Sequence, residues 1–226
     1  MQINADFSRR VALDTEALAW RVSPMAGVAR RMLDRIGGEV ARATSLVRYD
    51  PGSRFSAHVH EGGEEFLVLE GVFQDEHGDF PAGSYIRNPP TSRHTPGSAP
   101  GCVILVKLWQ FDPADRTPVR IDTGRIGAVA DAARPGVRVT PLFRDAAEEV
   151  RIETWAPGAA VELELPGGAE LFLLEGSLAE AGERLGPRAW LRLPPGYRGR
   201  AVAGPSGARL WVKSGHLLRI AAPGAA

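Results

Sequence analysis

An internal duplication is the feature that most restricts the fold of this chain of 226 residues. The spacing between equivalent positions runs from 105 residues, between Glu65 and Glu170, to 109 residues, between Gly27 and Gly136. The other matched segments are Val11–Thr15 with Val119–Thr123, Pro51–Gly52 with Pro157–Gly158, Glu65–Gly71 with Glu170–Gly176, Arg87–Pro90 with Arg192–Pro195, and Val106–Lys107 with Val212–Lys213. A period this long indicates a duplicated domain, because the repeats of solenoid proteins are shorter.

The duplication predicts two domains, residues 1–113 and 114–226, because the stretch Pro113–Pro118 breaks any regular element. The 26 glycines and 18 prolines recur at short intervals, which is typical of an all-β sandwich or barrel. The expected strands of the first domain are Glu39–Tyr49, Phe55–His60, Glu64–Leu69 and Cys102–Phe111. One turn of helix is expected at either Glu16–Trp20 or Ala146–Val150.

Composition excludes several classes of function. The 27 basic and 27 acidic residues balance to a formal net charge of +0, so the chain has no electrostatic footprint for nucleic acid or an anionic membrane. Cys102 is the single cysteine, which excludes an internal disulfide framework and an all-cysteine zinc cluster. Residues 1–10 have no apolar signal core, and no run approaches the roughly 18 apolar residues of a membrane span. We therefore expect a cytoplasmic protein.

Three of the five histidines gather in one short region. His58 and His60 are two residues apart, so on a strand both side chains leave the same face. Glu64 follows after a glycine turn. His94 lies on a later segment, which begins at Gly83. Three imidazoles and a carboxylate are a suitable ligand set for a divalent first-row metal. We predict that His58, His60, Glu64 and His94 bind one metal ion per chain.

The spacing of these residues resembles that of the cupin superfamily. Its first motif is a glycine, five residues, H-x-H, three or four residues, a glutamate, six residues and a glycine, and its second runs from a glycine through P-x-G to a histidine and an asparagine. The matching residues are Gly52, His58, His60, Glu64 and Gly71 in the first motif, and Gly83, Pro89 and His94 in the second. Thr91 and Ser98 replace the glycine and the asparagine of the second motif. The resemblance implies two tandem cupin barrels, each a double-stranded β-helix or jelly roll.

The second copy does not keep the ligands. Its loop between Gly158 and Glu170 is one residue shorter, so the histidine pair corresponds either to Leu163 and Leu165 or to Glu164 and Pro166. Gly199 stands at the position of His94. We therefore expect metal in the first copy alone, and we expect His216 and His77 to be surface residues.

Neighbouring residues leave some roles open. Glu65 competes with Glu64, but its counterpart in the metal-free copy favours a structural role. Tyr85 belongs to the expected barrel core, although its hydroxyl could reach a ligand. Arg54 and Arg93 are expected to be solvated, with binding of a substrate carboxylate as the alternative. Cys102 precedes an apolar strand and is expected to be buried and inert.

Within the superfamily, residues 40–112 resemble the cupin domain of ChrR-type anti-sigma factors. That resemblance implies zinc on the four predicted ligands, with iron, manganese or nickel as alternatives. The sigma-binding part of such proteins is a separate helical domain with its own histidine and cysteine zinc site, so sigma-factor inhibition is not inferred. Acidification through roughly pH 6 should empty the site, because metal binding needs deprotonated histidines.

Two classes of function remain. The first is a small-molecule-binding sensor or regulatory bicupin without turnover. The second is a metal-dependent dioxygenase or related enzyme acting on a small diketone, enol or carboxylate. The ligand set alone does not separate them, because one fold carries many activities. The sequence assigns no catalytic residue, substrate or protein partner. The hypothesis of a homodimer stays open, because cupins often pair.

Overall fold

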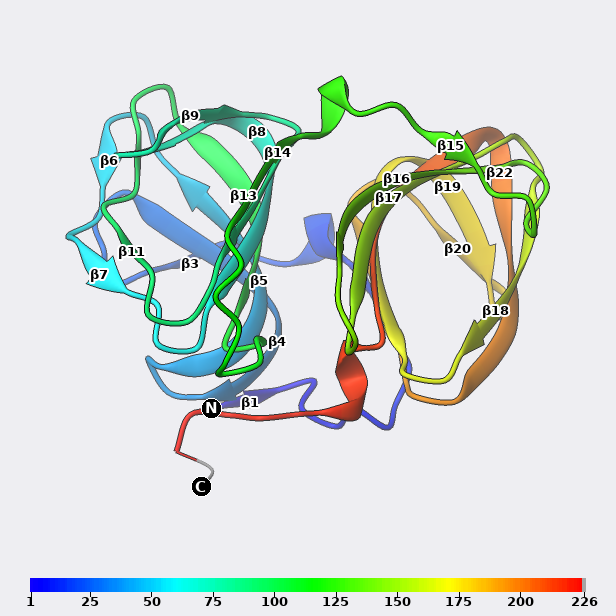
Figure 1. Ribbon diagram of the computed structural model, residues 1–226, viewed down its shortest axis with the longest axis horizontal. Helices are drawn as coiled ribbons and strands as arrows, with labels where there is room; N and C mark the ends of the chain where they lie inside the picture. Colours follow the sequence, from blue (N-terminus) through cyan, green and yellow to red (C-terminus); the bar gives the residue numbers. More distant parts are fainter. Residues whose placement is uncertain (225–226) are drawn as a thin grey trace. The chain divides into compact units, whose positions relative to one another are not determined.

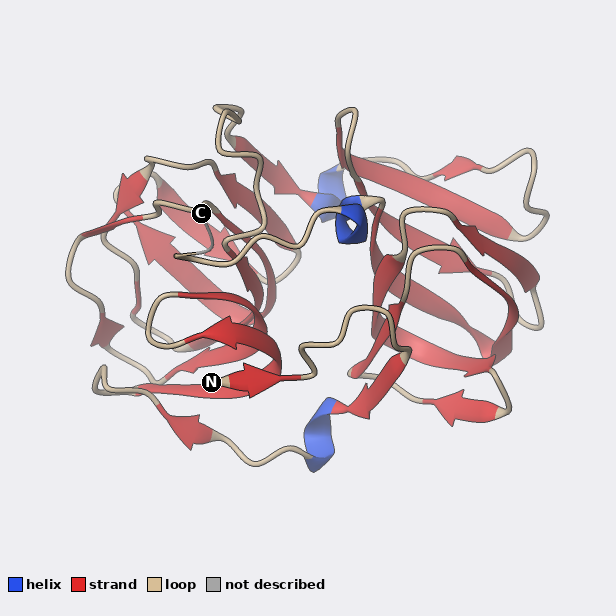
Figure 2. Ribbon diagram, turned by 90° about the horizontal axis from the view of Figure 1, so that it is seen from below, coloured by secondary structure: helices blue, strands red, loops and turns tan. Residues whose placement is uncertain are grey.

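The computed structural model describes residues 1–224, and almost all of its regular structure is antiparallel β-strand (Figure 1). Figure 2 shows that the helices of the described residues are short single turns. This confirms the prediction of an all-β chain. The chain divides into two compact units, each made from more than one segment. The first comprises Met1–Ala5, Ala19–Arg125 and the segment from Ile220 onward, and the second comprises Asp6–Leu18 and Ile126–Arg219.

The first unit contains an 11-stranded sheet and a separate two-stranded ribbon within the described residues. The main order of the large sheet is β1-β4-β5-β13-β8-β10-β14, and the ribbon pairs β7 with β11. The elements are β1 (Gln2–Ile3), β3 (Arg21–Val22), β4 (Val28–Gly37), β5 (Ala41–Tyr49), β6 (Ser53–Arg54), β7 (His58–Val59), β8 (Glu64–Asp75), β9 (Gly78–Pro81), β10 (Ser84–Asn88), β11 (Arg93–His94), β12 (Gly97–Ser98), β13 (Cys102–Leu108), β14 (Val119–Asp122) and the 3₁₀ turn η2 (Thr123–Arg125).

The second unit contains a nine-stranded sheet within the described residues, and its main order is β15-β16-β17-β22-β19-β21-β2. The elements are β2 (Val11–Asp14), η1 (Thr15–Ala17), β15 (Val129–Ala130), β16 (Val137–Arg144), β17 (Glu149–Trp155), β18 (Ala160–Leu165), β19 (Ala169–Glu180), β20 (Glu183–Leu185), β21 (Ala189–Leu193), β22 (Tyr197–Ser214) and η3 (His216–Leu218).

The first strands of the two sequence repeats are exchanged between the units. Val11–Asp14 pairs with β21 of the second unit, whereas Val119–Asp122 pairs with β10 of the first unit. Each unit is therefore completed by the opening strand of the other repeat. The remaining strands keep equivalent registers, as the pair Asn88 with Glu64 and the pair Leu193 with Ala169 show.

Alternation along β8 separates the core of the first unit from a polar face. Phe66 and Val68 are buried in one apolar cluster, to which β4, β5, β10 and β13 also contribute. The side chain of Glu64 points to the same core face as that of Phe66, because the two residues are two positions apart on the strand. Glu65 leaves on the other face, where it is buried and accepts a hydrogen bond from the Tyr85 hydroxyl at 2.9 Å. The same alternation thus assigns the two adjacent carboxylates to different environments.

Two local expectations need correction, and the helical turn expected at Glu16–Trp20 is shifted. The strand expected at Phe55–His60 is reduced to His58–Val59. Ala146–Val150 holds no helical turn, because Asp145 caps a tight turn there and β17 begins at Glu149. The helical turn forms instead at Thr15–Ala17, where the Asp14 side chain accepts a hydrogen bond from the backbone N–H of Glu16.

His216 is a further correction, because it is buried rather than on the surface. Its Nε2 lies 3.0 Å from Oε1 of Glu170, a residue that is itself fully buried. The pair gives the buried Glu170 carboxylate and Nε2 of His216 a polar partner, which lowers the cost of burying both. Within residues 1–224, no helix has the length and hydrophobicity needed to cross a bilayer.

Candidate metal centre

Three histidines from two adjoining segments meet on one side of the first unit. His58 on β7 and His94 on β11 are direct cross-strand partners, and their ring centroids are 5.2 Å apart. The ring of His60 lies 4.8 Å from that of His58 and 4.7 Å from that of His94. One ring nitrogen from each histidine lies within 4.8 Å of the others. The three imidazoles predicted from spacing are therefore brought together.

Two hydrogen bonds fix the backbone of His60, although this residue lies outside the β7–β11 ribbon. Its N–H donates to the carbonyl of Ser92, and its own carbonyl accepts from the N–H of Thr91, both at 2.9 Å. Thr91 adopts a left-handed conformation with φ 74°, at the position where the cupin motif has glycine. The substitution therefore keeps the turn that glycine would make, at the cost of backbone strain.

Glu64, the first residue of β8, adds a carboxylate to the three rings. Its Oε2 lies 3.3 Å from Nε2 of His60 and 3.5 Å from Nε2 of His94. Asn88, opposite Glu64 in the sheet, donates its side-chain amide to the same oxygen at 3.1 Å. The carboxylate is thus oriented toward the rings by a neighbouring strand.

Hydrogen bonds fix the tautomers of two of the histidines. Nδ1 of His58 lies 3.0 Å from the carbonyl oxygen of Ser56, and a carbonyl only accepts, so Nδ1 must carry the proton. Nδ1 of His94 lies 3.1 Å from Oδ2 of Asp75 and donates to it in the same way. In both rings the lone pair is left on Nε2. A carboxylate or carbonyl behind the ring is the usual support for a metal-binding histidine.

The geometry fits a metal ion. Nε2 of His60 and Nε2 of His94 are buried and make no hydrogen bond within the described chain, although buried polar atoms nearly always do. Ligands about 2.1 Å from a tetrahedral ion lie about 3.4 Å apart. The distances of 3.3 and 3.5 Å from Glu64 to these two nitrogens match that spacing.

The electrostatics of the two buried histidines differ. Burial lowers the pKa of His60, and the neighbouring imidazoles add to this effect, although Glu64 opposes it. Burial also disfavours protonation of His94, but the hydrogen bond to Asp75 and the charge of Glu64 outweigh it, so the pKa of His94 is raised. A bound cation would reverse this preference in favour of neutral rings, because it competes with the proton for Nε2.

The side of the cluster at His58 is open. His58 is only partly buried, whereas His60 and His94 are buried. Aromatic rings surround the cluster on the interior side, with Phe55 5.3 Å from Tyr49 and 6.0 Å from His58, and Phe73 5.8 Å from His94. The centre therefore combines a route to solvent with an apolar wall.

Several residues considered from sequence lie away from the cluster. The Tyr85 hydroxyl is bonded to Glu65 on the opposite face of the sheet, so it cannot serve as a ligand contact at this centre. Arg54, Arg93 and His77 are exposed, as expected. Cys102 is buried, and burial raises the pKa of its thiol to about 11, which agrees with an inert cysteine.

Sequence reasoning missed Asp75 and Asn88, the two residues that orient the candidate ligands. Asp75 stands 19 residues before His94 in a polar turn, and nothing in its local sequence distinguishes it from the acids around it. Asn88 precedes the prolines of the second motif, and only its place opposite Glu64 reveals its role.

The second unit has no equivalent cluster in the described residues. Leu163 pairs with Gly199, as His58 pairs with His94 in the first unit. This register selects Leu163 and Leu165 as the counterparts of the histidine pair. Ala169 stands where the first unit has Glu64.

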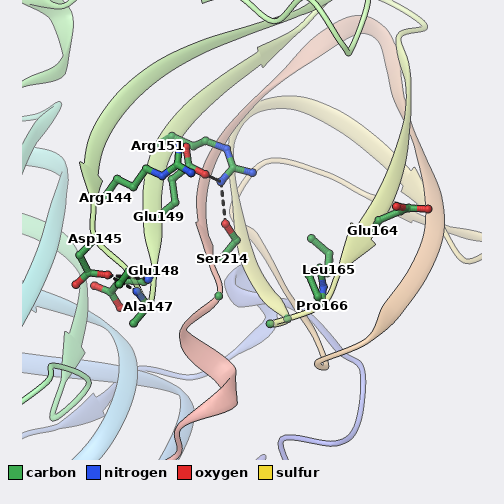
Figure 3. A pocket seen from close by; sticks show the side chains of 14 residues that line it. Arg144, Asp145, Ala147, Glu148, Glu149, Arg151, Glu164, Leu165, Pro166 and Ser214 are labelled. Carbon is green, nitrogen blue, oxygen red and sulfur yellow. Dashed lines mark hydrogen bonds and ion pairs between the residues drawn. The ribbon is translucent and has the colours of Figure 1, made fainter.

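The second unit instead has an open pocket of about 380 Å³ (Figure 3). Arg151, which lines this pocket, pairs with Glu149 at 3.4 Å and donates to Oγ of Ser214 at 2.9 Å; outside the lining it donates to Glu153 at 2.6 Å. Lys213 pairs with Glu148 at 2.9 Å.

Comparisons with known proteins agree with this architecture. Residues 8–112 match the family model of the ChrR cupin-like domain. None of the curated proteins compared with the chain matches it.

Solved structures resemble nearly the whole chain. A dioxygenase candidate from Nostoc punctiforme has 16% identity and a TM-score of 0.75, over 95% of this chain and 85% of that one. Protein Ylba from Escherichia coli has 14% identity and a TM-score of 0.70, over 96% and 94% of the two chains. The bacterial pirin YhhW from Escherichia coli, in complex with nickel(II), has 11% identity and a TM-score of 0.66, over 91% and 98%. At these identities the likeness shows the fold, and the family match identifies residues 8–112 as a cupin-like domain.

Proposed function

We propose that this protein is a bicupin that binds one divalent metal ion through His58, His60, Glu64 and His94 in its first unit. The observation that carries the proposal is the convergence of two buried, unbonded Nε2 atoms on one carboxylate oxygen at 3.3 and 3.5 Å. Each unit would be a cupin jelly-roll barrel, and the second would have kept the fold without the ligands. The metal would act as a Lewis acid that polarises a bound oxygen.

Zinc is the metal we propose first, because three imidazoles and a carboxylate suit it and the distances from Glu64 to the rings of His60 and His94 match a tetrahedral spacing. Iron, manganese and nickel accept the same donor atoms in octahedral geometry. Elemental analysis of protein purified without added metal decides among them.

We propose that the centre serves a sensor or regulatory role by binding a small molecule. The match of residues 8–112 to the ChrR cupin-like domain supports this role. The partly exposed His58 supplies a route by which a ligand could reach the metal.

The second candidate is a metal-dependent dioxygenase acting on a small diketone, enol or carboxylate. The open side of the cluster favours it, because a metal with four protein ligands and octahedral geometry keeps two positions for substrate and dioxygen. Stoichiometric iron together with oxygen uptake on adding a β-diketone would select this candidate. Stoichiometric zinc without oxygen uptake would select the sensor.

Substitution of His94 tests the metal centre itself. His94→Ala and His60→Ala should each reduce the bound metal to background, as measured by elemental analysis of folded protein. His77→Ala is the matched control, because His77 is exposed and lies outside the cluster. Wild-type metal content in either ligand variant would refute the assignment.

A further inference from the structure

A tryptophan covers the turn that joins two of the candidate ligands. Gly62 lies between His60 and Glu64, and a Cβ added to it would meet ring atoms of Trp109 at 2.2 to 2.6 Å. The indole therefore lies against this glycine at a distance that leaves no room for a side chain. The N–H of Trp109 also donates to the carbonyl of Gly63 at 3.2 Å. Trp109 thus contacts the turn through its ring and through its backbone.

Trp109 has a backbone conformation that large side chains rarely adopt. Its φ is 58°, in the left-handed region, where a Cβ crowds the carbonyl that follows it. The residue before it, Leu108, ends β13 and is the cross-strand partner of Glu64. The left-handed residue therefore stands where the chain leaves the sheet beside a candidate ligand. Backbone strain of this kind is concentrated at functional sites.

The second unit makes the same connection without this strain. Gly215 follows β22 as Trp109 follows β13, and its N–H donates to the carbonyl of Gly168 at 3.0 Å. Its φ is 91°, which glycine adopts freely. The connection therefore does not require a tryptophan. The tryptophan occurs in the unit with the three-histidine cluster, and the glycine occurs in the unit whose described residues hold no such cluster.

The indole changes how the turn lies on the chain. In the second unit Gly167 corresponds to Gly62, and a Cβ added to Gly167 would lie 2.6 Å from Cα of Gly215. That turn rests on the backbone itself. In the first unit, the three atoms nearest to the same added Cβ all belong to the ring of Trp109. The ring is therefore a spacer between the turn and the chain that follows β13.

We propose that Trp109 is a positioning residue of the metal centre, with its indole ring as the spacer that sets the separation of His60 and Glu64. Nε2 of His60 lies 3.3 Å from Oε2 of Glu64, which suits two ligands of one ion. Without the ring, the turn has room to settle on the chain as its counterpart does in the second unit, and both ligands would shift. Trp109 acts through the turn, because an indole N–H only donates and has no lone pair for an ion. This inference rests on the proposed metal centre and adds a residue that controls its geometry.

Competition with a chromophoric zinc chelator tests the proposal on the full chain. Trp109→Gly should raise the dissociation constant for zinc about tenfold or more, because changes behind metal ligands cost about 10- to 100-fold. Trp109→Phe keeps a flat ring and should restore most of the affinity. Trp20→Gly is the matched control, because Trp20 is also a partly buried tryptophan of the first unit, and its ring stacks on Arg31 and Arg48. This control should bind zinc as the wild type does.

A spectroscopic measurement separates positioning from a general loss of structure. The visible absorption of bound Co(II) depends on its coordination geometry, so Trp109→Gly should alter the spectrum of the cobalt-loaded protein, whereas Trp109→Phe and Trp20→Gly should keep it. Thermal unfolding of the metal-free proteins shows which variants are folded. If Trp109→Gly does not fold, Trp109→Asn takes its place, because asparagine accepts the left-handed conformation and carries no ring.

The two proposals fail in different ways. Wild-type protein that binds neither zinc nor cobalt refutes the metal centre, and the role of Trp109 with it. If the wild type binds zinc, a folded variant without the ring that keeps the affinity within twofold and the cobalt spectrum unchanged refutes the role of Trp109 and leaves the metal centre standing. An equal loss of affinity in Trp20→Gly, or no recovery in Trp109→Phe, also overturns the positioning role.

Discussion

Replacing Asp75 by asparagine should weaken metal binding without touching a ligand atom. Oδ2 of Asp75 lies 3.1 Å from Nδ1 of His94, and each side chain is 2% exposed. Asparagine has nearly the same shape but no charge, and its amide can turn an N–H toward the ring. Burial opposes ionisation of Asp75, but the hydrogen bond from His94 outweighs it, so its pKa is lowered and the carboxylate is charged at neutral pH.

The expected loss follows from the hydrogen bond and the charge. A hydrogen bond to a charged group contributes about 1.5–3 kcal/mol, which corresponds to roughly 10- to 150-fold in an equilibrium constant. Changes to the group behind a metal-binding histidine cost about 10- to 100-fold in affinity. We therefore expect Asp75→Asn to raise the dissociation constant for zinc by about 10- to 100-fold.

Competition with a chromophoric zinc chelator at pH 7.5 measures this change, and thermal unfolding of the metal-free proteins shows whether the fold is intact. Glu76→Gln is the matched control. Glu76 is the adjacent exposed acid, and its carboxylate accepts from the backbone N–H of Thr95 at 2.8 Å rather than from a ring. A change of less than twofold in Asp75→Asn, or the same change in both variants, would show that Asp75 does not support His94.

Three other predictions concern single residues of the first unit. Glu64→Gln should lower the zinc content with little loss of stability. Glu65→Gln should keep zinc and destabilise the fold by roughly 3 kcal/mol in urea denaturation, because it breaks a buried ion pair with Arg87. The reverse pattern would show that Glu65 is the ligand and Glu64 the structural residue. Thr91→Gly should raise the free energy of unfolding by about 0.5–1 kcal/mol, since φ is 74° there and glycine relieves the strain, and a lower value would contradict it. The folded pKa of Cys102 is about 11, above the ordinary thiol value, so burial of the neutral thiol adds stability below about pH 9 that is lost as pH rises through 11. A thiol reagent at pH 8 should label Cys102 only after denaturation, and rapid labelling of folded protein would refute its burial.

The candidate ligands were accessible from sequence because their signals are local. His58 and His60 are two residues apart and β-strands alternate, so their shared face follows from spacing. The alternation of side chains along a strand also separates Glu64 from Glu65, and the structure places these two carboxylates on opposite faces of the sheet. The duplication likewise appeared as a near-constant offset between equivalent segments.

The residues that orient the ligands depended on contacts that no local pattern encodes. Asp75 meets His94, and Asn88 meets Glu64, through strand pairings that join distant parts of the chain. His216 was expected at the surface because it lies outside the motif, and its partner Glu170, 46 residues away, meets it only in the folded chain.

The sequence by itself determined the all-β class, the duplication and the approximate positions of the metal-binding candidates, since these depend on alternation and turn chemistry over a few residues. Only the tertiary structure decided that Val11–Asp14 and Val119–Asp122 each complete the sheet formed by the other repeat. Both strands begin with valine, end with aspartate and carry an aliphatic residue before it, so local propensity cannot choose between partners. That choice depends on which long-range pairing buries the strand, and burial is a property of the folded chain.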